Sequence, residues 1–225
     1  MTNAERKWLK VFPNLAPEKI MEQFIPLLGA AWKERKHSFS KNDLEDSITR
    51  TLYIHIQKAI REKNTAWGLH YQPEVLEEGV NGVGRIIGRC DLTISAANYS
   101  YIYECKRLWT EGNNALFTKS ARLYVTEGLC RFLQPSKKQQ IPEPQYSSWL
   151  KFAGMLGYVM DGTTVKAFEA IKNALGKYAP AQRLESPCLP TCPTGEAYRF
   201  CSTHINCVQK IVHAHHILLS VCASQ

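Results

Sequence analysis

Three side chains near the middle of the chain have the types and the spacing needed for metal-ion chemistry. Asp91 lies in one apolar run, and Glu104 and Lys106 lie in the next, with a short polar break at residues 95–100 between the runs. Two such runs around a polar break predict an antiparallel hairpin. Because side chains alternate along a strand, Glu104 and Lys106 point to the same face, and Asp91 on the neighbouring strand can fold over to meet them.

These residue types support hydrolysis assisted by a divalent cation. Two carboxylates can hold Mg²⁺, which keeps water molecules at its remaining positions. A lysine beside them can orient or help to deprotonate an attacking water, or steady developing phosphate charge. The alternative is a weak, exposed Glu–Lys pair on a surface hairpin. Ile102, Tyr103 and Cys105 favour a strand that is buried on both faces, where ionisable groups indicate a site.

The pattern Asp-x12-Glu-x-Lys resembles the catalytic core of the PD-(D/E)xK nuclease superfamily. The resemblance implies an α/β fold with a central mixed sheet flanked by helices, the restriction-endonuclease-like core. It also implies that Asp91 and Glu104 bind the metal and that Lys106 serves the water. Cys90 stands where a proline often precedes the aspartate in that superfamily.

A helix ahead of the hairpin is predicted to carry a further acid. Ser40-Lys-Asn-Asp43 has a hydroxyl cap and a first-turn acid, both typical of a helix start. An apolar stripe at four-residue spacing follows, formed by Leu44, Ile48, Leu52, Ile56 and Ile60. In the superfamily such a helix commonly supplies an acidic metal ligand, so the resemblance makes Glu45 a third ligand and a catalytic residue. The alternative is that Glu45 is a first-turn acid favoured by the helix dipole.

Basic residues near the hairpin are candidates for contact with a nucleic-acid backbone. The chain carries a formal charge of +8, which favours a polyanionic partner. Lys119 and Arg122 lie three apart on a helix predicted over residues 115–133, and Arg107 directly follows the lysine strand. We expect these three residues to hold phosphates, with a solvated basic face as the alternative.

The rest of the chain predicts one domain over residues 1–225. We expect a helical cover over 1–39, flexible loops at 134–148 and 179–196, and a buried strand within 149–160. An amphipathic helix over 164–178 and strands near 198–203 and 208–219 complete an α/β core. No apolar stretch reaches the length of a membrane span, and the first residues lack a signal-peptide core, so a cytoplasmic protein without membrane association is expected.

Eight cysteines allow a rival metal site. Cys188, Cys192, Cys201 and Cys207 crowd the C-terminal part, but their intervals are irregular for structural zinc. Disulfides are not expected without an export signal. A zinc-stabilised interaction protein therefore stays an alternative of low weight.

Taken together, the residues predict a Mg²⁺-dependent phosphodiesterase that cleaves DNA, with Mn²⁺ as a substitute ion. The resemblance extends this to a bacterial antiviral defence effector or toxin that uses a partner protein for targeting. A homo-oligomer is left open. The second class of function is a non-catalytic module that binds nucleic acid or protein on the same fold.

Overall fold

The computed structural model describes residues 17–78, 84–96, 99–109, 114–135, 144–146, 152–161, 163–185 and 197–221. The helices are α2 (Pro17–Arg35), α3 (Glu45–Lys63), α4 (Asn114–Leu123), α5 (Cys130–Leu133) and α6 (Thr164–Tyr178), with a 3-10 turn η2 (Lys36–Ser38) and a π-helical segment η3 (Tyr124–Leu129). The strands are β1 (Gly68–Tyr71), β2 (Glu74–Glu78), β3 (Gly84–Arg89), β4 (Leu92–Ala96), β5 (Tyr99–Leu108), β6 (Phe152–Val159), β7 (Arg183–Glu185), β8 (Ala197–Ile205) and β9 (Ile211–Ser220).

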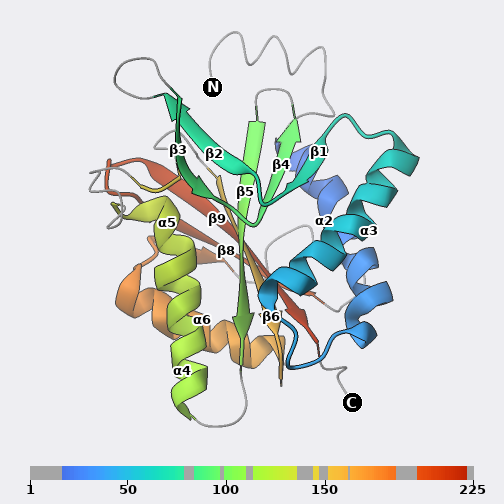
Figure 1. The fold of residues 1–225 in the computed structure, drawn as a ribbon. Coiled ribbons are helices and arrows are strands. Elements are labelled where there is room, and N and C mark those ends of the chain that lie inside the picture. Colours follow the sequence, from blue (N-terminus) through green and yellow to red (C-terminus); the bar gives the residue numbers. More distant parts are fainter. Residues whose placement is uncertain are drawn as a thin grey trace.

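The centre of the molecule is a seven-stranded mixed sheet in the order β1-β4-β5-β6-β9-β8-β7 (Figure 1). The three middle strands, β5, β6 and β9, are parallel, and antiparallel strands extend the sheet on both sides. β2 and β3 pair with each other in a separate antiparallel sheet. The predicted α/β class with a central mixed sheet flanked by helices is confirmed.

Helices cover both faces of the main sheet and enclose two apolar layers. α2 and α3 pack on one face, where Trp32, Leu52 and Tyr158 are fully buried. The segment α4–η3–α5 and helix α6 pack on the other face over Met155, Phe200 and their neighbours. β6 lies in the middle and is buried along nearly its whole length, as expected for a parallel strand covered on both faces.

The sequence stripe of α3 predicts most of its buried face. Ile48, Leu52, Ile56 and Ile60 are buried against the sheet, and the helix ends at Asn64 in the left-handed conformation. The predicted start is wrong in detail, because the helix begins at Glu45 with no side-chain cap. Ser40 and Asp43 instead close a turn before it, in which the Asp43 carboxylate accepts a hydrogen bond from the Ser40 backbone N–H. Leu44 precedes the helix and is exposed, so it does not belong to the stripe.

The first apolar run is not one strand of a hairpin, as the sequence predicted. It is divided at Cys90 and Asp91 into β3, which belongs to the small sheet, and β4, which belongs to the main sheet. Backbone hydrogen bonds tie the break to the end of β1, from Gln72 N–H to the Asp91 carbonyl and from Cys90 N–H to the Pro73 carbonyl. The hairpin itself is formed by β4 and β5, with Leu92 opposite Tyr103.

Other expected elements are found close to their predicted bounds. α6 spans Thr164–Tyr178, and the Thr163 hydroxyl accepts a hydrogen bond from the Lys166 N–H. Of the helical cover expected over 1–39, α2 spans Pro17–Arg35 and continues through Pro26, and residues 1–16 lie outside the described part of the chain. Strand β7 falls inside the segment 179–196 that was expected to be a loop. Within the described residues, no helix has the length and apolar character needed to cross a membrane.

Candidate functional site

The candidate site lies where β4 and β5 separate. β4 pairs with β5 only as far as Leu92 opposite Tyr103, whereas β5 continues along β6 to Leu108. The β5 backbone beyond Tyr103 therefore has an edge that no strand covers. Two carboxylates fill it: Asp91 Oδ2 accepts the Cys105 N–H at 2.6 Å, and Glu45 Oε2 accepts the Arg107 N–H at 3.1 Å. Each acid thus satisfies a backbone donor that the departing strand leaves unpaired.

Lys106 contacts acids from two chain segments, Glu45 at the start of α3 and Glu104 in β5. Its Nζ lies 3.2 Å from Glu45 Oε1 and 3.7 Å from Glu104 Oε2, and it also donates to the Cys105 carbonyl at 2.7 Å. Glu104 and Lys106 leave the strand on the same face, as their spacing predicts. The structure therefore brings together all four predicted catalytic residues, Glu45, Asp91, Glu104 and Lys106.

The four residues Glu45, Asp91, Glu104 and Lys106, which we call the carboxylate cluster, differ in their exposure to solvent. The Glu104 side chain is 0% exposed, Lys106 is 17% exposed and Glu45 is 30% exposed. Asp91 is also partly exposed. A ligand from solvent would meet Glu45 and Asp91 first, with Glu104 at the base.

Two further residues hold Glu104, and the sequence did not identify either as part of the site. Arg131, in α5, donates to Glu104 Oε2 at 2.8 Å and to the Tyr146 hydroxyl at 3.0 Å. The Tyr146 hydroxyl donates to Glu104 Oε1 and also lies 3.1 Å from the Arg89 carbonyl. Both oxygens of Glu104 are therefore engaged. Tyr146 is buried, although the sequence predicted a flexible loop over 134–148. An aromatic residue within that Pro-rich segment is the signal that could have found it.

Burial and repulsion from Asp91 raise the pKa values of two acids, Glu104 and Glu45. Burial, followed by the charge of Asp91, raises the pKa of Glu104 to about 7, against the opposing effects of Arg131 and Lys106. Burial also raises the pKa of Glu45. For Lys106, burial acts to lower the pKa, but the charges of Glu45 and Glu104 outweigh it and the pKa is raised. Lys106 therefore carries its positive charge at neutral pH, which suits stabilisation of an anion.

The donor types fit a hard divalent cation, but the present arrangement is not a coordination shell. Three carboxylates face two cationic side chains, Lys106 and Arg131, so the cluster has an excess of one negative charge when all five are ionised. In the part of the chain that the structure describes, no three His, Cys, Asp or Glu side chains form a group that could hold a metal as they stand. Glu45 and Glu104 would have to exchange present partners for an ion.

The predicted phosphate-binding residues lie in two different settings. The Arg107 guanidinium donates to the Asp43 carbonyl at 3.0 Å and stacks over the Trp109 ring, 5.0 Å from its centroid. Lys119 and Arg122 are exposed on α4, which packs beside β5. The Arg107 guanidinium is thus held by Asp43 and Trp109, on the face of β5 opposite to Lys106, whereas the two α4 residues are exposed to solvent.

The cysteine alternative is weakened by one residue. Cys201 is disulfide-bonded, whereas Cys207 is an exposed free thiol. A sulfur in a disulfide is not a zinc ligand, since zinc binds the thiolate. The expectation that the chain would form no disulfide is wrong at Cys201. Cys188 and Cys192 lie outside the described residues.

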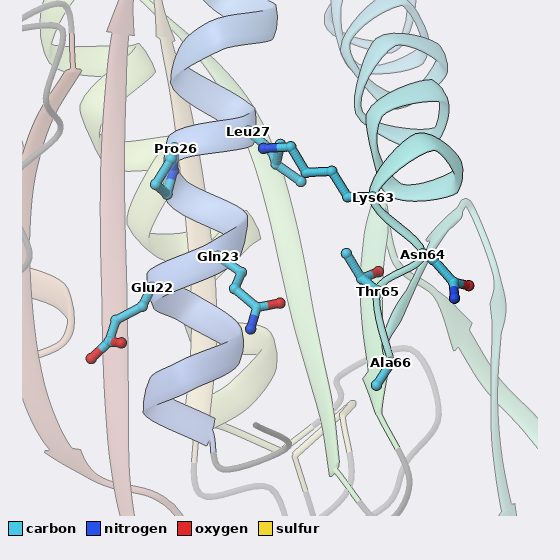
Figure 2. Close-up of a pocket in the computed structure, with 8 residues that line it drawn as sticks. All are labelled: Glu22, Gln23, Pro26, Leu27, Lys63, Asn64, Thr65 and Ala66. Atoms are coloured by element: carbon cyan, nitrogen blue, oxygen red, sulfur yellow. The ribbon is translucent and has the colours of Figure 1, made fainter. Parts of the chain in front are cut away.

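A hollow of about 490 Å³ lies between α2 and the end of α3, lined by Glu22, Gln23, Pro26, Leu27 and residues 63–66 (Figure 2). It is at the opposite end of α3 from Glu45, and a 19-residue helix is roughly 28 Å long. Its two charged residues do not converge: Glu22 pairs with Lys19 on the exposed side of α2, and Lys63 comes from α3. The hollow therefore lacks the clustered ionisable groups that distinguish the carboxylate cluster.

Comparison with known proteins adds no relative to these observations. No protein-family model, curated protein or solved structure matches the chain.

Proposed function

We propose that the protein is a Mg²⁺-dependent phosphodiesterase of the PD-(D/E)xK type that cleaves DNA. The observation that carries the proposal is the convergence of four side chains from separate segments: Glu45 from α3, Asp91 from the break before β4, and Glu104 and Lys106 from β5. Ionisable groups that are buried together with shifted pKa values favour a functional site.

A phosphodiester is negatively charged and resists attack by a nucleophile. A bound divalent ion would neutralise the phosphate and supply an activated water. Glu45, Asp91 and Glu104 are the proposed ligands for Mg²⁺, or for Mn²⁺ in its place. The charged Lys106 amine holds and steadies the phosphate oxygens, and its contacts with Glu45 and Glu104 fix its position.

DNA is the proposed substrate because the chain has a formal charge of +8 and carries exposed basic residues on the helix beside β5. These are Lys119 and Arg122 on α4, and Arg107 on β5 is the third proposed phosphate contact. Contacts of this kind read the backbone and not the base sequence, so binding should weaken steeply with salt. The role of a defence effector or toxin with a targeting partner, acting in the cytoplasm, is an extension by analogy.

A cleavage assay with matched variants tests the proposal. Plasmid, linear duplex, single strands and RNA are incubated with the protein, with and without Mg²⁺ or Mn²⁺. Asp91→Ala and Lys106→Ala should abolish metal-dependent cleavage. Glu104→Ala should do so through lost metal affinity and recover in part at high Mn²⁺. Glu127→Ala, an exposed acid on η3, is the control and should cut normally. Wild-type rates in both the Asp91 and Lys106 variants would refute the assignment.

A non-catalytic binding module is the second candidate. Both oxygens of Glu104 already have protein partners, which is also the arrangement of a structural ion pair. Such a module would bind nucleic acid or a partner protein and show no divalent-ion dependence. Binding of DNA without cleavage at any concentration of Mg²⁺ or Mn²⁺ would favour it.

A further inference from the structure

The Glu104 carboxylate has a cationic partner that the proposed mechanism does not use. Arg131 contacts Glu104 Oε2 at 2.8 Å, a shorter distance than the 3.7 Å to Lys106. Glu104 is the deepest acid of the cluster, and a buried carboxylate needs an opposite charge close by. Arg131 therefore supplies to Glu104 what a metal ion would supply.

A guanidinium and a divalent ion are both positively charged, so each weakens the binding of the other at one carboxylate oxygen. Both oxygens of Glu104 are engaged, Oε1 by the Tyr146 hydroxyl and Oε2 by Arg131, so an ion that binds Glu104 must displace or share a partner. We infer that Arg131 competes with a divalent cation for Glu104, and that this ion pair sets how tightly the site takes up metal. The inference rests on the proposed function, since it concerns the regulation of that same site.

The position of Arg131 lets it leave Glu104. Its side chain is 33% exposed, whereas Glu104 is 0% exposed, so the arginine can swing toward solvent while the acid stays fixed. Arg131 is the second residue after the π-helical segment η3, and π-helical turns often occur at functional sites. A guanidinium also binds phosphate in a bidentate manner. An arriving phosphodiester would therefore draw Arg131 from Glu104 and open the acid to the ion.

Metal affinity without substrate tests this competition. Calorimetric titration with Mn²⁺ compares the full-length wild type with Arg131→Met, which keeps the aliphatic stem and removes the charge. We expect Arg131→Met to bind Mn²⁺ about tenfold more tightly, which is the effect of removing a competing interaction of about 1.4 kcal/mol. Arg50→Met is the control, because Arg50 also pairs with a carboxylate, Asp46 at 2.9 Å, outside the cluster. Its Mn²⁺ affinity should equal that of the wild type.

A second variant covers the case in which Arg131→Met does not fold. Tyr146→Phe removes one hydroxyl that contacts both Glu104 and Arg131 and leaves the charges intact. It should bind Mn²⁺ more tightly than the wild type by a smaller factor. The thermal midpoint of each variant should also rise more on addition of Mn²⁺ than that of the wild type, because the ion replaces lost stabilisation.

The outcomes separate the inference from the proposed function. If the wild type cleaves DNA with Mn²⁺ but the Arg131 and Tyr146 variants bind the ion no more tightly, the competition is refuted and the nuclease stands. If no form of the protein binds Mn²⁺ or cleaves DNA, both ideas are refuted. Tighter binding in both variants, together with an unchanged Arg50 control, supports the competition.

Discussion

Two polar clusters contact the same helical segment, α4–η3–α5, one through Arg131 and the other through Tyr124, and they differ in charge and access. The carboxylate cluster around β5 reaches solvent through Glu45 and holds several charges. The second cluster, which we call the histidine cluster, consists of Tyr124, Ser202, His204 and His216, and all four are buried. The Ser202 hydroxyl lies 2.8 Å from His216 Nε2 and 2.7 Å from His204 Nε2, and the Tyr124 hydroxyl lies 3.1 Å from His216 Nδ1.

The difference separates a site from a polar part of the core. In the histidine cluster, burial lowers the pKa of His204 to about 4 and lowers that of His216, so both rings stay neutral. The hydroxyls and three of the four ring nitrogens are paired within the cluster, whereas His204 Nδ1 is buried with no hydrogen-bond partner among the described residues. The carboxylate cluster retains an excess of negative charge and an opening to solvent. Burial of polar residues alone is therefore a poor indicator of function, and uncompensated charge with access is a better one.

The largest expected difference between the clusters is the effect of a substitution on DNA cleavage. Lys106→Met is expected to lower metal-dependent DNA cleavage at least about a hundredfold, because the charge that faces the phosphate is lost. Ser202→Ala removes the hydroxyl that links the two histidines and should cut at the wild-type rate. Initial rates on plasmid DNA, normalised to folded protein, provide the measurement. Comparable losses of cleavage rate in Lys106→Met and Ser202→Ala would show that the two clusters do not differ in function.

A substitution in the histidine cluster should instead lower the free energy of unfolding and leave cleavage unchanged. His216→Ala removes a ring that stacks on Phe200 with centroids 4.1 Å apart, and it leaves a buried space. We expect a loss of about 3 kcal/mol in the free energy of unfolding, as for other large-to-small changes in a core. Urea denaturation measures the loss, and cleavage per folded molecule should not change. A loss below about 0.5 kcal/mol would show that the cluster is not a packed part of the core.

The two clusters should respond to pH in opposite directions when no divalent ion is present. The folded pKa of Glu104, about 7, is above its ordinary value of 4.5, so the folded protein gains stability from this group as pH falls from about 7 to 4.5. The folded pKa of His204, about 4, is below its ordinary 6.5, so stability is lost as pH falls from 6.5 to about 4.

Single substitutions isolate each contribution. The difference in free energy of unfolding between Glu104→Gln and the wild type should disfavour the variant more at pH 5 than at pH 8. The reason is that the variant lacks the stability that the wild type gains on acidification. For His204→Gln the same difference should disfavour the variant less at pH 5 than at pH 8, because the variant lacks the group that costs the wild type stability on acidification. Urea denaturation at both pH values gives the difference in free energy for each variant. Parallel shifts of the two variants would contradict the assignment of opposite signs.

The smallest effect tests whether the shared helical segment links the clusters. A Cβ added at Gly128 in η3 would lie 2.5 Å from Met155 Cε and 3.7 Å from Lys106 Cγ. The methionine tip can move, so Gly128→Ala should cost only about 1 kcal/mol of stability. Cleavage should change less than about twofold, because the added Cβ makes only an ordinary van der Waals contact with the Lys106 stem. Gly176→Ala on α6 meets nothing within 4 Å and should instead stabilise by about 0.5–1 kcal/mol, with unchanged cleavage.

Elements with a clear local period were predicted well from the sequence. α6 was predicted within its observed bounds, and the stripe of α3 was correct except for Leu44. Glu104 and Lys106 face the same way because alternation along a strand is a local property. The division of the first apolar run at Asp91 was missed, because two adjacent β-rich stretches give the same pattern whether they enter one sheet or two.

The sequence by itself determined which side chains could do chemistry and which way two of them point. Only the tertiary structure decided that Asp91 and Glu45 fill the edge of β5 that β4 leaves open, and that Arg131 and Tyr146 hold Glu104. The physical reason is the distance along the chain over which each property is set. Periodicity is set by the geometry of neighbouring residues. The partner of a buried charge is chosen by packing between segments that are far apart in the chain, 61 residues apart for Glu45 and Lys106.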